Sequence, residues 1–532
     1  MMQQISFPAP DSMPGPQVFE PTGIPQLDLV LGGGLARSKL VVLFGPPGSG
    51  KTTLAGQIGF AAAKRGQKVL ILTTFSESTM KLLQHLQYFR FYDPNLIGSS
   101  VQVFSLQQFL AQGVSTLYQE IAATVSQVQA NLVILDGFQG IRDIYRDIAA
   151  TRQLIYNLGM RLSLQGTTML ITTEADPRDP EHFPEMTTAD ALIGLYSKLE
   201  GVRTFRSLEV LKVRGRAPLV GRHSLHMDEG GIQIFPRLEA RTRSLTFEGW
   251  PASSTHTALS ERATFGLPRL DSLLGGGLTR QTGTLLVGSQ GTGKTLLAFQ
   301  FALAGVSQGE AVLFLGFRET GEQLMQKADA FGMGTHLRAA LATGKAGGKL
   351  LLQRWEPVEL DPDQVATHLL IALEQTNARR VVIDSIAELE RAVEESSGKA
   401  RVPDYLAALM AALRAQGVTL LAIKEIPRLL PTQIDFSADV VAVLAENVLL
   451  TRQAIHQGYL YRLFSVLKMR FSAYDYAVHE MVLAPAQGIQ FPAADEGRQA
   501  MLERLALQQV KVGEDIEHLS CSLEGNPGAS KP

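Results

Sequence analysis

GPPGSGKT at residues 45–52 and GSQGTGKT at residues 288–295 decide the fold of this chain. Both satisfy the pattern G-x-x-x-x-G-K-[ST], and each lies between an apolar run typical of a strand and a stretch with helical spacing. In this setting the glycines let the loop curl, so that backbone N–H groups and a helix N-terminus face phosphate oxygens. Because an ordinary glycine-rich turn is not expected twice in matched surroundings, the motifs predict two nucleoside triphosphate sites.

Each motif supplies a set of predicted ATP contacts. Lys51 and Lys294 are expected to bridge the β and γ phosphates in catalysis, and the hydroxyls of Thr52 and Thr295 to hold Mg²⁺. The predicted ATP-binding residues are Gly45, Gly48, Ser49, Gly50, Lys51, Thr52 and Thr53 in the first motif, and Gly288, Gly291, Thr292, Gly293, Lys294, Thr295 and Leu296 in the second.

The surroundings of the motifs indicate a tandem repeat. TGIPQLDLVLGGGLARSKLVVLFGPPGSGKTTLA at 22–55 is matched by FGLPRLDSLLGGGLTRQTGTLLVGSQGTGKTLLA at 265–298, a shift of 243 positions. A period of this length indicates a duplicated domain and is too long for the unit of a solenoid. We expect an N-terminal tail at 1–17, domains at 18–240 and 262–492, a linker at 241–261 and a C-terminal tail at 493–532. In that tail RQAMLERLALQQV has helical spacing, and it either docks on a partner or on the body, or forms a loosely attached amphipathic helix.

Length and composition exclude several classes of protein. The 532 residues exceed one typical domain, and an apolar content of 45% can fill real cores. Lys and Arg number 49 against 51 acids, which argues against a non-specific DNA binder without excluding a local basic patch. The single cysteine, Cys521, cannot form an intrachain disulfide and suits a reducing cytosol. With neither a signal-peptide pattern nor a long apolar stretch, we expect a soluble cytoplasmic protein without a membrane partner.

Short apolar runs alternate with helical stretches in both halves. The expected strands are KLVVLFG, KVLILTTF, LVILDGF and TTMLITTEA in the first half, and GTLLVG, AVLFLGF, RVVIDSI and VTLLAIKE in the second. Runs of this length, separated by helices, are typical of parallel strands buried on both faces. The predicted fold class is therefore α/β, with a mostly parallel sheet flanked by helices in each half.

Acidic residues of two kinds are expected at the nucleotide. Asp136 ends LVILD and Asp384 ends RVVID, which suits a Walker B carboxylate that fixes water around Mg²⁺, although an Asp that caps the next helix looks the same. Glu77 in TTFSEST and Glu319 in GFRET follow the strand after the P-loop helix and are candidate general bases. A solvated Glu in the first turn of a helix is the competing interpretation.

A Lys-x-Arg pair closes an apolar strand in each half. The pairs are Lys212 with Arg214 in SLEVLKVRG at 207–215, and Lys468 with Arg470 in LFSVLKMRF at 463–471. Residues two apart on a strand share a face, so alternation places both cations on one side and Leu211 on the other. Beside a P-loop lysine, further cations are needed only where charge develops late in phosphoryl transfer. A solvated edge strand whose cations deter aggregation is the alternative.

These residues resemble the KaiC-like branch of the RecA superfamily, which includes the clock ATPases of cyanobacteria. The resemblance covers about 18–240 and 262–492 and is carried by GIPQLDLVLGGGL, the two P-loops, LEVLKVRG, GIQIFPRLE and LKMR. It implies two tandem RecA-like domains, assembly of six subunits into stacked rings, and ATP between neighbouring subunits. It also implies that the Lys-x-Arg pairs contact the nucleotide of the adjacent subunit.

The sequence departs from that family at three places. Two adjacent glutamates of the family become Ser76-Glu77 and Arg318-Glu319, so the first carboxylate is missing in both copies and slow hydrolysis or an ATP-holding role is expected. The family's phosphorylated Ser-Thr pair aligns with Asp435-Phe436, which have no hydroxyl to accept a phosphoryl group, although Thr432 and Ser437 are near and Asp435 can mimic a phosphorylated residue. A family histidine is replaced by Pro218 and Tyr474.

We therefore expect a protein that forms a ring, hydrolyses Mg-ATP and signals its nucleotide state to a regulatory protein partner. The resemblance implies that this ring is a hexamer. Three alternatives stay open. The first is a serine/threonine autokinase that uses Thr432 or Ser437. The second is a RecA-like, ATP-gated DNA binder, which the mixed or acidic segments after Asp136 and Asp384 argue against. The third is an ATP-stabilised scaffold without turnover. The sequence names neither the partner, the hydrolysis rate nor the more active domain.

Overall fold

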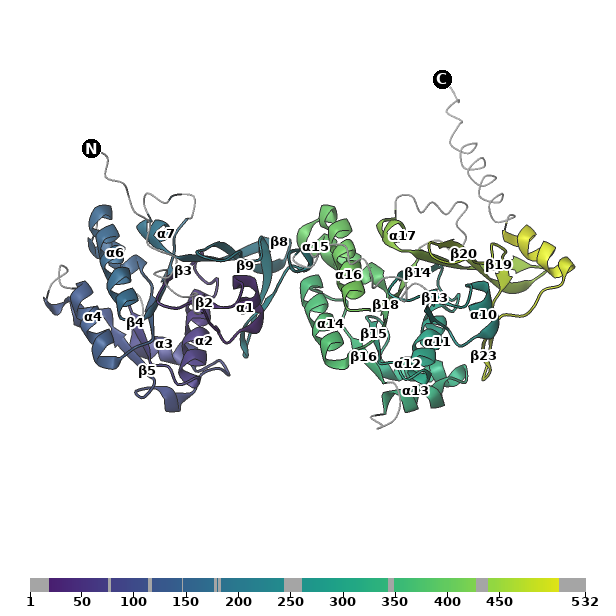
Figure 1. Ribbon diagram of the computed structural model, residues 1–532, viewed down its shortest axis with the longest axis horizontal. Helices are drawn as coiled ribbons and strands as arrows, with labels where there is room; N and C mark the ends of the chain where they lie inside the picture. The colour runs from purple at the N-terminus through teal and green to yellow at the C-terminus, as the bar shows by residue number, and fades with distance from the viewer. Residues whose placement is uncertain are drawn as a thin grey trace, which may run out of the picture. The chain divides into compact units, whose positions relative to one another are not determined.

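The computed structural model describes residues 19–74, 78–112, 117–145, 147–176, 179, 183–243, 261–342, 349–426 and 439–506. Contacts divide the chain into unit 1, Met1–Arg241, and unit 2, Thr242–Pro532. Each unit has a mixed, mostly parallel sheet flanked by helices (Figure 1), which confirms the predicted α/β class. Within the described residues, no helix is both long and apolar enough to cross a bilayer.

Unit 1 is built on a nine-stranded sheet of order β11-β10-β9-β8-β3-β7-β6-β4-β5. Its strands are β1 (Phe19–Glu20), β2 (Leu35–Ala36), β3 (Leu40–Phe44), β4 (Val69–Thr73), β5 (Val101–Ser105), β6 (Leu132–Asp136), β7 (Thr168–Thr173), β8 (Ala191–Glu200), β9 (Arg203–Val213), β10 (Arg222–Asp228) and β11 (Gly231–Phe235). Its helices are α1 (Pro25–Leu31), α2 (Lys51–Lys64), α3 (Thr79–Leu86), α4 (Leu117–Val128), α5 (Gln139–Tyr145), α6 (Ile148–Leu164), α7 (Pro184–Thr188) and α8 (Leu238–Arg243), with 3-10 turns at η2 (Pro94–Leu96) and η3 (Leu106–Gln112).

Unit 2 is built on an eight-stranded sheet of order β16-β15-β17-β18-β14-β19-β20-β21. Its strands are β12 (Arg262–Ala263), β13 (Leu278–Thr279), β14 (Gly283–Gly288), β15 (Val312–Gly316), β16 (Leu350–Arg354), β17 (Arg380–Asp384), β18 (Thr419–Glu425), β19 (Asn447–His456), β20 (Tyr459–Met469), β21 (His479–Glu480), β22 (Val482–Ala484) and β23 (Gly488–Gln490). Its helices are α10 (Pro268–Leu273), α11 (Lys294–Ser307), α12 (Gly321–Ala330), α13 (Gly334–Leu341), α14 (Pro362–Thr376), α15 (Ile386–Ser397), α16 (Val402–Ala415) and α17 (Val440–Leu444), with a 3-10 turn at η5 (Lys399–Arg401).

The two sheets share one strand order. In both units the P-loop strand, β3 or β14, lies in the middle, and the strand that ends in the predicted Walker B aspartate, β6 or β17, lies two positions away. The strand between them is β7 in unit 1 and β18 in unit 2, and all three strands are parallel. Their carboxyl ends therefore meet at one edge of the sheet, where open α/β sheets bind ligands.

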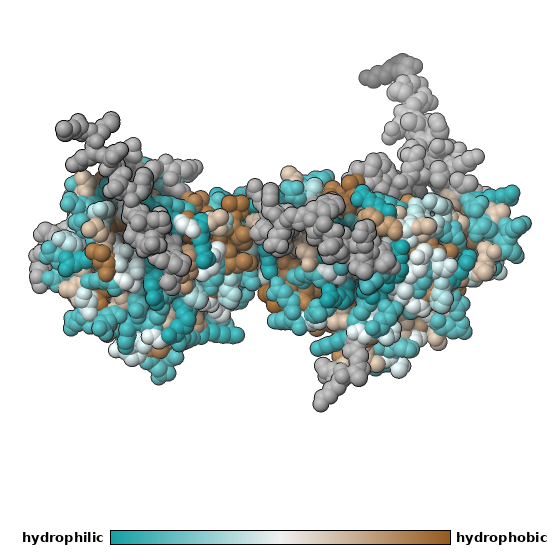
Figure 2. All heavy atoms as spheres, viewed as in Figure 1, coloured by the Kyte–Doolittle hydropathy of each residue, from teal (hydrophilic) through white to brown (hydrophobic). Residues whose placement is uncertain are grey.

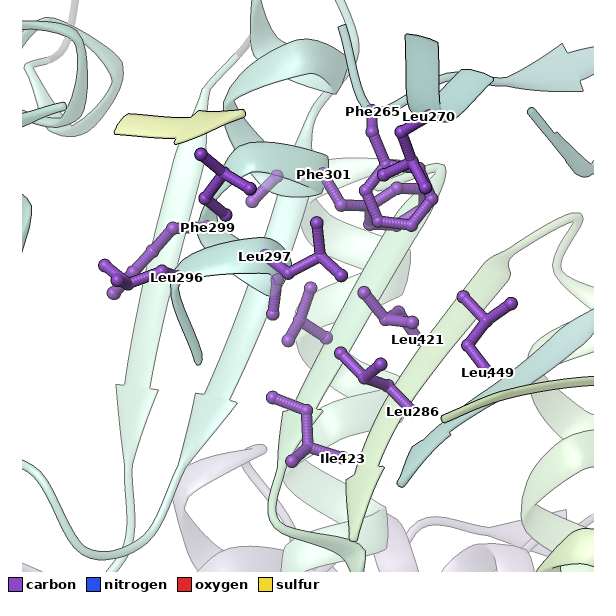
Figure 3. Packing of buried hydrophobic residues seen from close by; sticks show 14 of the residues in the cluster. Phe265, Leu270, Leu286, Leu296, Leu297, Phe299, Phe301, Leu421, Ile423 and Leu449 are labelled. Atoms are coloured by element: carbon purple, nitrogen blue, oxygen red, sulfur yellow. The ribbon is translucent and has the colours of Figure 1, made fainter. Parts of the chain in front are cut away.

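The central strands are buried on both faces, as their uninterrupted apolar runs predict. In β3, Val41 and Leu43 belong to one core cluster, whereas Val42 and Phe44 belong to the cluster on the opposite face. In unit 2 the side chains of α11 pack against those of the sheet (Figure 3). The labelled residues of this cluster are Phe265, Leu270, Leu286, Leu296, Leu297, Phe299, Phe301, Leu421, Ile423 and Leu449.

Arg380, the first residue of β17, is fully buried in unit 2. Its Nε donates to Glu310 Oε2 at 2.7 Å, and its terminal nitrogens donate to the Phe301 carbonyl at 3.0 Å and to Gln308 Oε1 at 2.7 Å. Gly305 makes room for it, because a Cβ at Gly305 would lie 2.7 Å from Arg380 Cδ and Nε. By the alignment of the copies, unit 1 has Leu132, Gln67 and Ala62 in place of Arg380, Glu310 and Gly305.

A β-bulge interrupts the strand that carries each Lys-x-Arg pair. On β9 the partner strand pairs with Lys212 and then with Val210, so that Leu211 is skipped, and Leu467 is skipped in the same way on β20. The regular alternation expected around Leu211 is interrupted at this point, and Leu211 is 42% exposed, as Leu467 is 41% exposed. Exposed apolar residues of the β8–β9 hairpin appear in brown among mainly hydrophilic atoms in Figure 2.

The described part of the C-terminal tail docks on unit 2. Residues 496–506 are helical. Leu502 and Leu505 are buried against Ala454 of β19 and Leu463 of β20. Arg498 forms an ion pair with Glu480 next to this contact. Of the alternatives for this tail, docking on the body therefore holds up to residue 506. The expected tail at 1–17 and most of the expected linker lie outside the described residues.

Candidate nucleotide sites

The first P-loop connects β3 to α2 and leaves the start of that helix open. Gly50 precedes the helix with φ of 99°, and no side chain caps the first turn. Its left-handed conformation favours glycine, as does that of Gly48 with φ of 71°. Uncapped N–H groups at a helix start bind anions readily. Lys51 Nζ donates to the carbonyls of Gly45 and Pro46, both at 2.8 Å, so the lysine lies along the loop that it is expected to serve.

Thr52 and Asp136 meet at the carboxyl ends of the strands. Thr52 Oγ1 lies 3.0 Å from Asp136 Oδ2, and Thr172 Oγ1 of β7 donates to Asp136 Oδ1 at 2.5 Å. Burial raises the pKa of Asp136, and the two hydroxyl hydrogen bonds offset this only in part. A buried carboxylate beside a P-loop hydroxyl is a suitable donor pair for Mg²⁺, which prefers oxygen ligands and usually retains phosphates and waters.

No cluster of three or more His, Cys, Asp or Glu side chains that could hold a metal is found in the described part of the chain. The protein therefore offers no complete metal cage of its own among these residues. This fits an ion held by one hydroxyl, one carboxylate and the phosphates of a nucleotide, as in P-loop hydrolases. The residues present thus suit Mg²⁺ bound together with the nucleotide.

The first site opens into a cleft of about 890 Å³. This volume lies within the usual range of about 300–1,000 Å³ for small-molecule sites. Besides P-loop residues and Asp136, the cleft is lined by His85 of α3, Glu174 and Met227 of β10. His85 Nε2 lies 3.1 Å from Thr53 Oγ1. Glu174 directly follows β7 and, with Asp136, counteracts the lowering of the Lys51 pKa by burial.

The second P-loop repeats this geometry. Gly293 precedes α11 with φ of 94°, and Lys294 Nζ donates to the Ser289 carbonyl at 2.7 Å. Thr295 Oγ1 donates to Asp384 Oδ2 at 2.7 Å, and burial raises the pKa of Asp384. The first position of each motif requires glycine, because a Cβ there would lie too close to a backbone carbonyl oxygen of the neighbouring strand.

A Cβ at Gly45 would lie 2.2 Å from the Leu195 carbonyl oxygen, and one at Gly288 would lie 2.4 Å from that of Thr451. The predicted contacts next to the lysines differ between the copies. Ser49 is buried at the loop, whereas Thr292 shares hydrogen bonds with Ser289 and Thr451.

Leu296 is placed differently from its counterpart Thr53. Its side chain belongs to the hydrophobic core of unit 2 (Figure 3), so any contact with a nucleotide would come from its backbone. The remaining predicted loop glycine, Gly291, has a left-handed φ of 78° like Gly48.

Ion pairs line a small cavity beside Asp384 in the second site. Its volume is about 70 Å³, and its lining includes Arg318, Glu319, Asp384 and Glu425. Arg318 Nε donates to Glu388 Oε1 at 2.7 Å, and a terminal nitrogen donates to Glu425 Oε2 at 3.0 Å. The hydrogen bond that Arg318 donates to Glu388 raises the pKa of Arg318, so the guanidinium stays charged.

The two candidate general bases cannot be compared directly. Glu77 lies outside the described residues, as do the residues singled out for autophosphorylation, Thr432, Asp435 and Ser437. Glu319 is described, and it forms an ion pair with Lys327 of α12. Lys327 corresponds in the repeat to His85 of unit 1.

The Lys-x-Arg pairs lie at the sheet edge opposite the P-loops. Lys212 Nζ donates to the Ala189 carbonyl at 2.5 Å, and Arg214 lies 3.5 Å from Asp190. Asp190 in turn accepts from the backbone N–H of Leu40, at the start of β3, whereas the P-loop follows the end of this five-residue strand. The cations are therefore roughly 15 Å from the P-loop of their own unit, at about 3.3 Å per strand residue.

Unit 2 has the same arrangement. Lys468 Nζ donates to the Ala445 carbonyl at 2.6 Å, and the adjacent Glu446 accepts from the backbone N–H of Gly283, at the start of β14. Arg470 follows β20 and is exposed. Burial, followed by the charge of Arg470, lowers the pKa of Lys468, and burial and Arg214 do the same for Lys212.

Sequence reasoning missed the carboxylates at the centre of each site. Glu174 directly follows β7 and Glu425 ends β18, the strands that lie between the P-loop strand and the Walker B strand in each unit. Each is close enough to oppose the lowering of the pKa of the P-loop lysine in its unit. The sequence did contain a signal for these carboxylates. The predicted strands TTMLITTEA and VTLLAIKE each have a Glu at or next to their carboxyl end.

Comparison with known proteins identifies the family of the chain. The family described as "ATPase: KaiC" matches residues 20–239 and 263–496, which include both P-loops. The circadian clock oscillator protein KaiC of Rippkaea orientalis is 26% identical over 477 residues, or 86% of each chain. The KaiC proteins of Thermostichus vulcanus and Synechococcus elongatus are 25% and 23% identical over 488 residues, or 87% of each chain. The chain belongs to the KaiC family of ATPases and carries two tandem KaiC domains.

Proposed function

We propose that the protein binds Mg-ATP at subunit interfaces of a ring, hydrolyses it slowly, and passes its nucleotide state to a protein partner. The observation that supports this most is the place of the Lys-x-Arg pairs. Both pairs lie at the sheet edge away from the P-loop of their own unit. A cation there cannot reach its own γ-phosphate, whereas it can reach that of a neighbour in a head-to-tail ring. Similarity to KaiC proteins favours six subunits.

Within each site the residues take distinct roles. Lys51 and Lys294 exchange loop carbonyls for phosphate oxygens, and the open helix starts donate N–H groups to the phosphates. Thr52 with Asp136, and Thr295 with Asp384, would hold Mg²⁺, which supplies positive charge to the phosphates. In hydrolysis the water oxygen bonds to the γ-phosphorus, the bond to the bridging oxygen of ADP breaks, and the water proton passes to a nearby acceptor. Glu77 in the first site and Glu319 in the second are the proposed acceptors.

The trans role of Arg214 can be tested by mixing subunits. All chains carry Lys294→Ala, so that turnover reports the first site. One chain adds Lys51→Ala and a second adds Arg214→Ala, and each alone should lose ATP hydrolysis by about 10³-fold or more, the scale of a supplied arginine. Mixed particles should regain activity, because an Arg214→Ala subunit keeps its P-loop and takes an arginine from its neighbour.

Two controls complete the design. Arg203→Ala, at the opposite end of β9, should leave turnover unchanged. The mass of the particle is measured with ATP and with ADP. A monomer under both conditions, or mixtures that stay inactive although both chains enter one particle, would show that the arginine does not act across subunits.

A further inference from the structure

The two nucleotide sites differ in the charges around their carboxylates. In the second site Arg318 bonds both Glu388 and Glu425, and Lys327 bonds Glu319. Glu388 is only 3% exposed, which fixes one end of the guanidinium, while the other end reaches across to the end of β18. The strand order β15-β17-β18 allows this, since Arg318 follows β15 and Glu425 ends β18, on either side of Asp384. The cations thus span the mouth of the cleft.

The first site lacks this set of cations. Ser76 stands where the second site has Arg318, and His85 stands where it has Lys327. His85 contacts the hydroxyl of Thr53 on the P-loop helix. Among the described residues of this site, Arg142 reaches the backbone carbonyl of Glu174 and the carboxylate of Glu185, but no ion pair to the Glu174 carboxylate is formed.

We propose that Arg318 and Lys327 suppress ATP hydrolysis at the second site by holding Glu425 and Glu319 in ion pairs, so that this site retains nucleotide while the first turns it over. This inference rests on the proposed function.

A carboxylate oxygen that already accepts a hydrogen bond from a guanidinium or an ammonium is less available to accept one from the attacking water molecule. The same ion pairs fix the positions of the Glu425 and Glu319 carboxylates. Binding is affected less than turnover, because the P-loop, Lys294, Thr295 and Asp384 keep the geometry of the first site. Arg318 and Lys327 are therefore positioning residues that act through the two glutamates.

The test uses the full chain with Lys51→Ala, so that turnover reports the second site. Arg318→Ser and Lys327→His restore the residues of the first copy, singly and together, and Arg318→Lys keeps the charge. The double variant should raise kcat by about tenfold or more, within the range of general-base effects, and change KM by less than about threefold. Arg318→Lys should raise it little. A fluorescent ATP analogue gives the affinity without turnover.

Arg338→Ser is the matched control, because Arg338 is as exposed as Arg318 and also pairs with an acidic residue, Asp329. It should leave kcat unchanged. An unchanged kcat in the double variant, an equal rise in the control, or loss of analogue binding in the double variant would each overturn the proposal. Failure of the proposed function looks different, because the chain with Lys294→Ala alone would then show no hydrolysis at the first site.

Discussion

Replacing Arg380 by Leu, the residue of the first copy, should destabilise unit 2 strongly. The change removes a fully buried guanidinium together with its bonds to Glu310, Gln308 and the Phe301 carbonyl. Glu310, whose side chain is 10% exposed, is left with Arg280 as its ion-pair partner among the described residues. Removing one member of a buried ion pair costs about 3–5 kcal/mol, because the other charge stays in a medium of low polarity.

The first copy also supplies the compensating change. Glu310→Gln, which introduces the residue found at Gln67, removes the buried charge that Arg380→Leu leaves behind. The double variant should therefore recover roughly half or more of the loss, since a neutral pair of similar volume is often close to neutral in stability. The structure therefore predicts that the double variant loses less stability than the sum of the losses of the two single variants.

Urea unfolding followed by tryptophan fluorescence measures these values. Of the two tryptophans only Trp355 lies in the described part of the chain, where it packs against His368 in unit 2. In a Trp250→Phe background the signal therefore reports unit 2 alone. With a slope of about 3 kcal/mol/M, Arg380→Leu should lower the midpoint by about 1–1.7 M.

Two results of this assay would contradict the prediction for Arg380. A loss below about 1 kcal/mol for Arg380→Leu, less than the low end for a broken buried pair, would refute the reasoning. So would a double variant less stable than Arg380→Leu itself, because Glu310 would then stabilise unit 2 without the arginine.

Three further predictions follow from the described contacts. Gly305→Ala should destabilise unit 2 by about 1–3 kcal/mol in the same urea assay, because the added Cβ meets Arg380, and should cost much less in the Arg380→Leu chain. Burial raises the pKa of Asp136, so the ionised carboxylate destabilises the nucleotide-free fold above that pKa. Asp136→Asn should therefore raise the melting temperature at pH 7, and this gain should shrink as the pH falls towards 3.8. The same variant should lose Mg-dependent turnover at the first site. Leu502→Ala with Leu505→Ala should cost about 2 kcal/mol or more and make the C-terminal helix sensitive to limited proteolysis, whereas an unchanged digestion pattern would contradict its docking.

The sequence predicted the parts of each site that depend on neighbours along the chain. The P-loop, the strand before it and the aspartate at the end of a later strand are local patterns, and β3, β6 and their counterparts lie where these patterns indicate. The meeting of Thr52 with Asp136 also followed, because carboxyl ends of parallel strands share one edge.

Contacts that depend on strand order could not be read in this way. Arg318 was seen only as a missing carboxylate, since its partners lie 70 and 107 positions further along the chain. The break in the alternation at Leu211 was not predicted, because a bulge interrupts the period of two without a mark in the residue types around it. The central position of Glu174 likewise required the order of β3, β7 and β6.

The space that Gly305 leaves for Arg380 also restricts how the two halves of the gene can exchange segments. Recombination between the repeats that carried the first copy's P-loop helix into the second domain would bring Ala62 with it, and its methyl group would meet the guanidinium. Gene conversion across this region therefore produces weakened chains unless helix and strand move together, and this favours the continued divergence of the two domains.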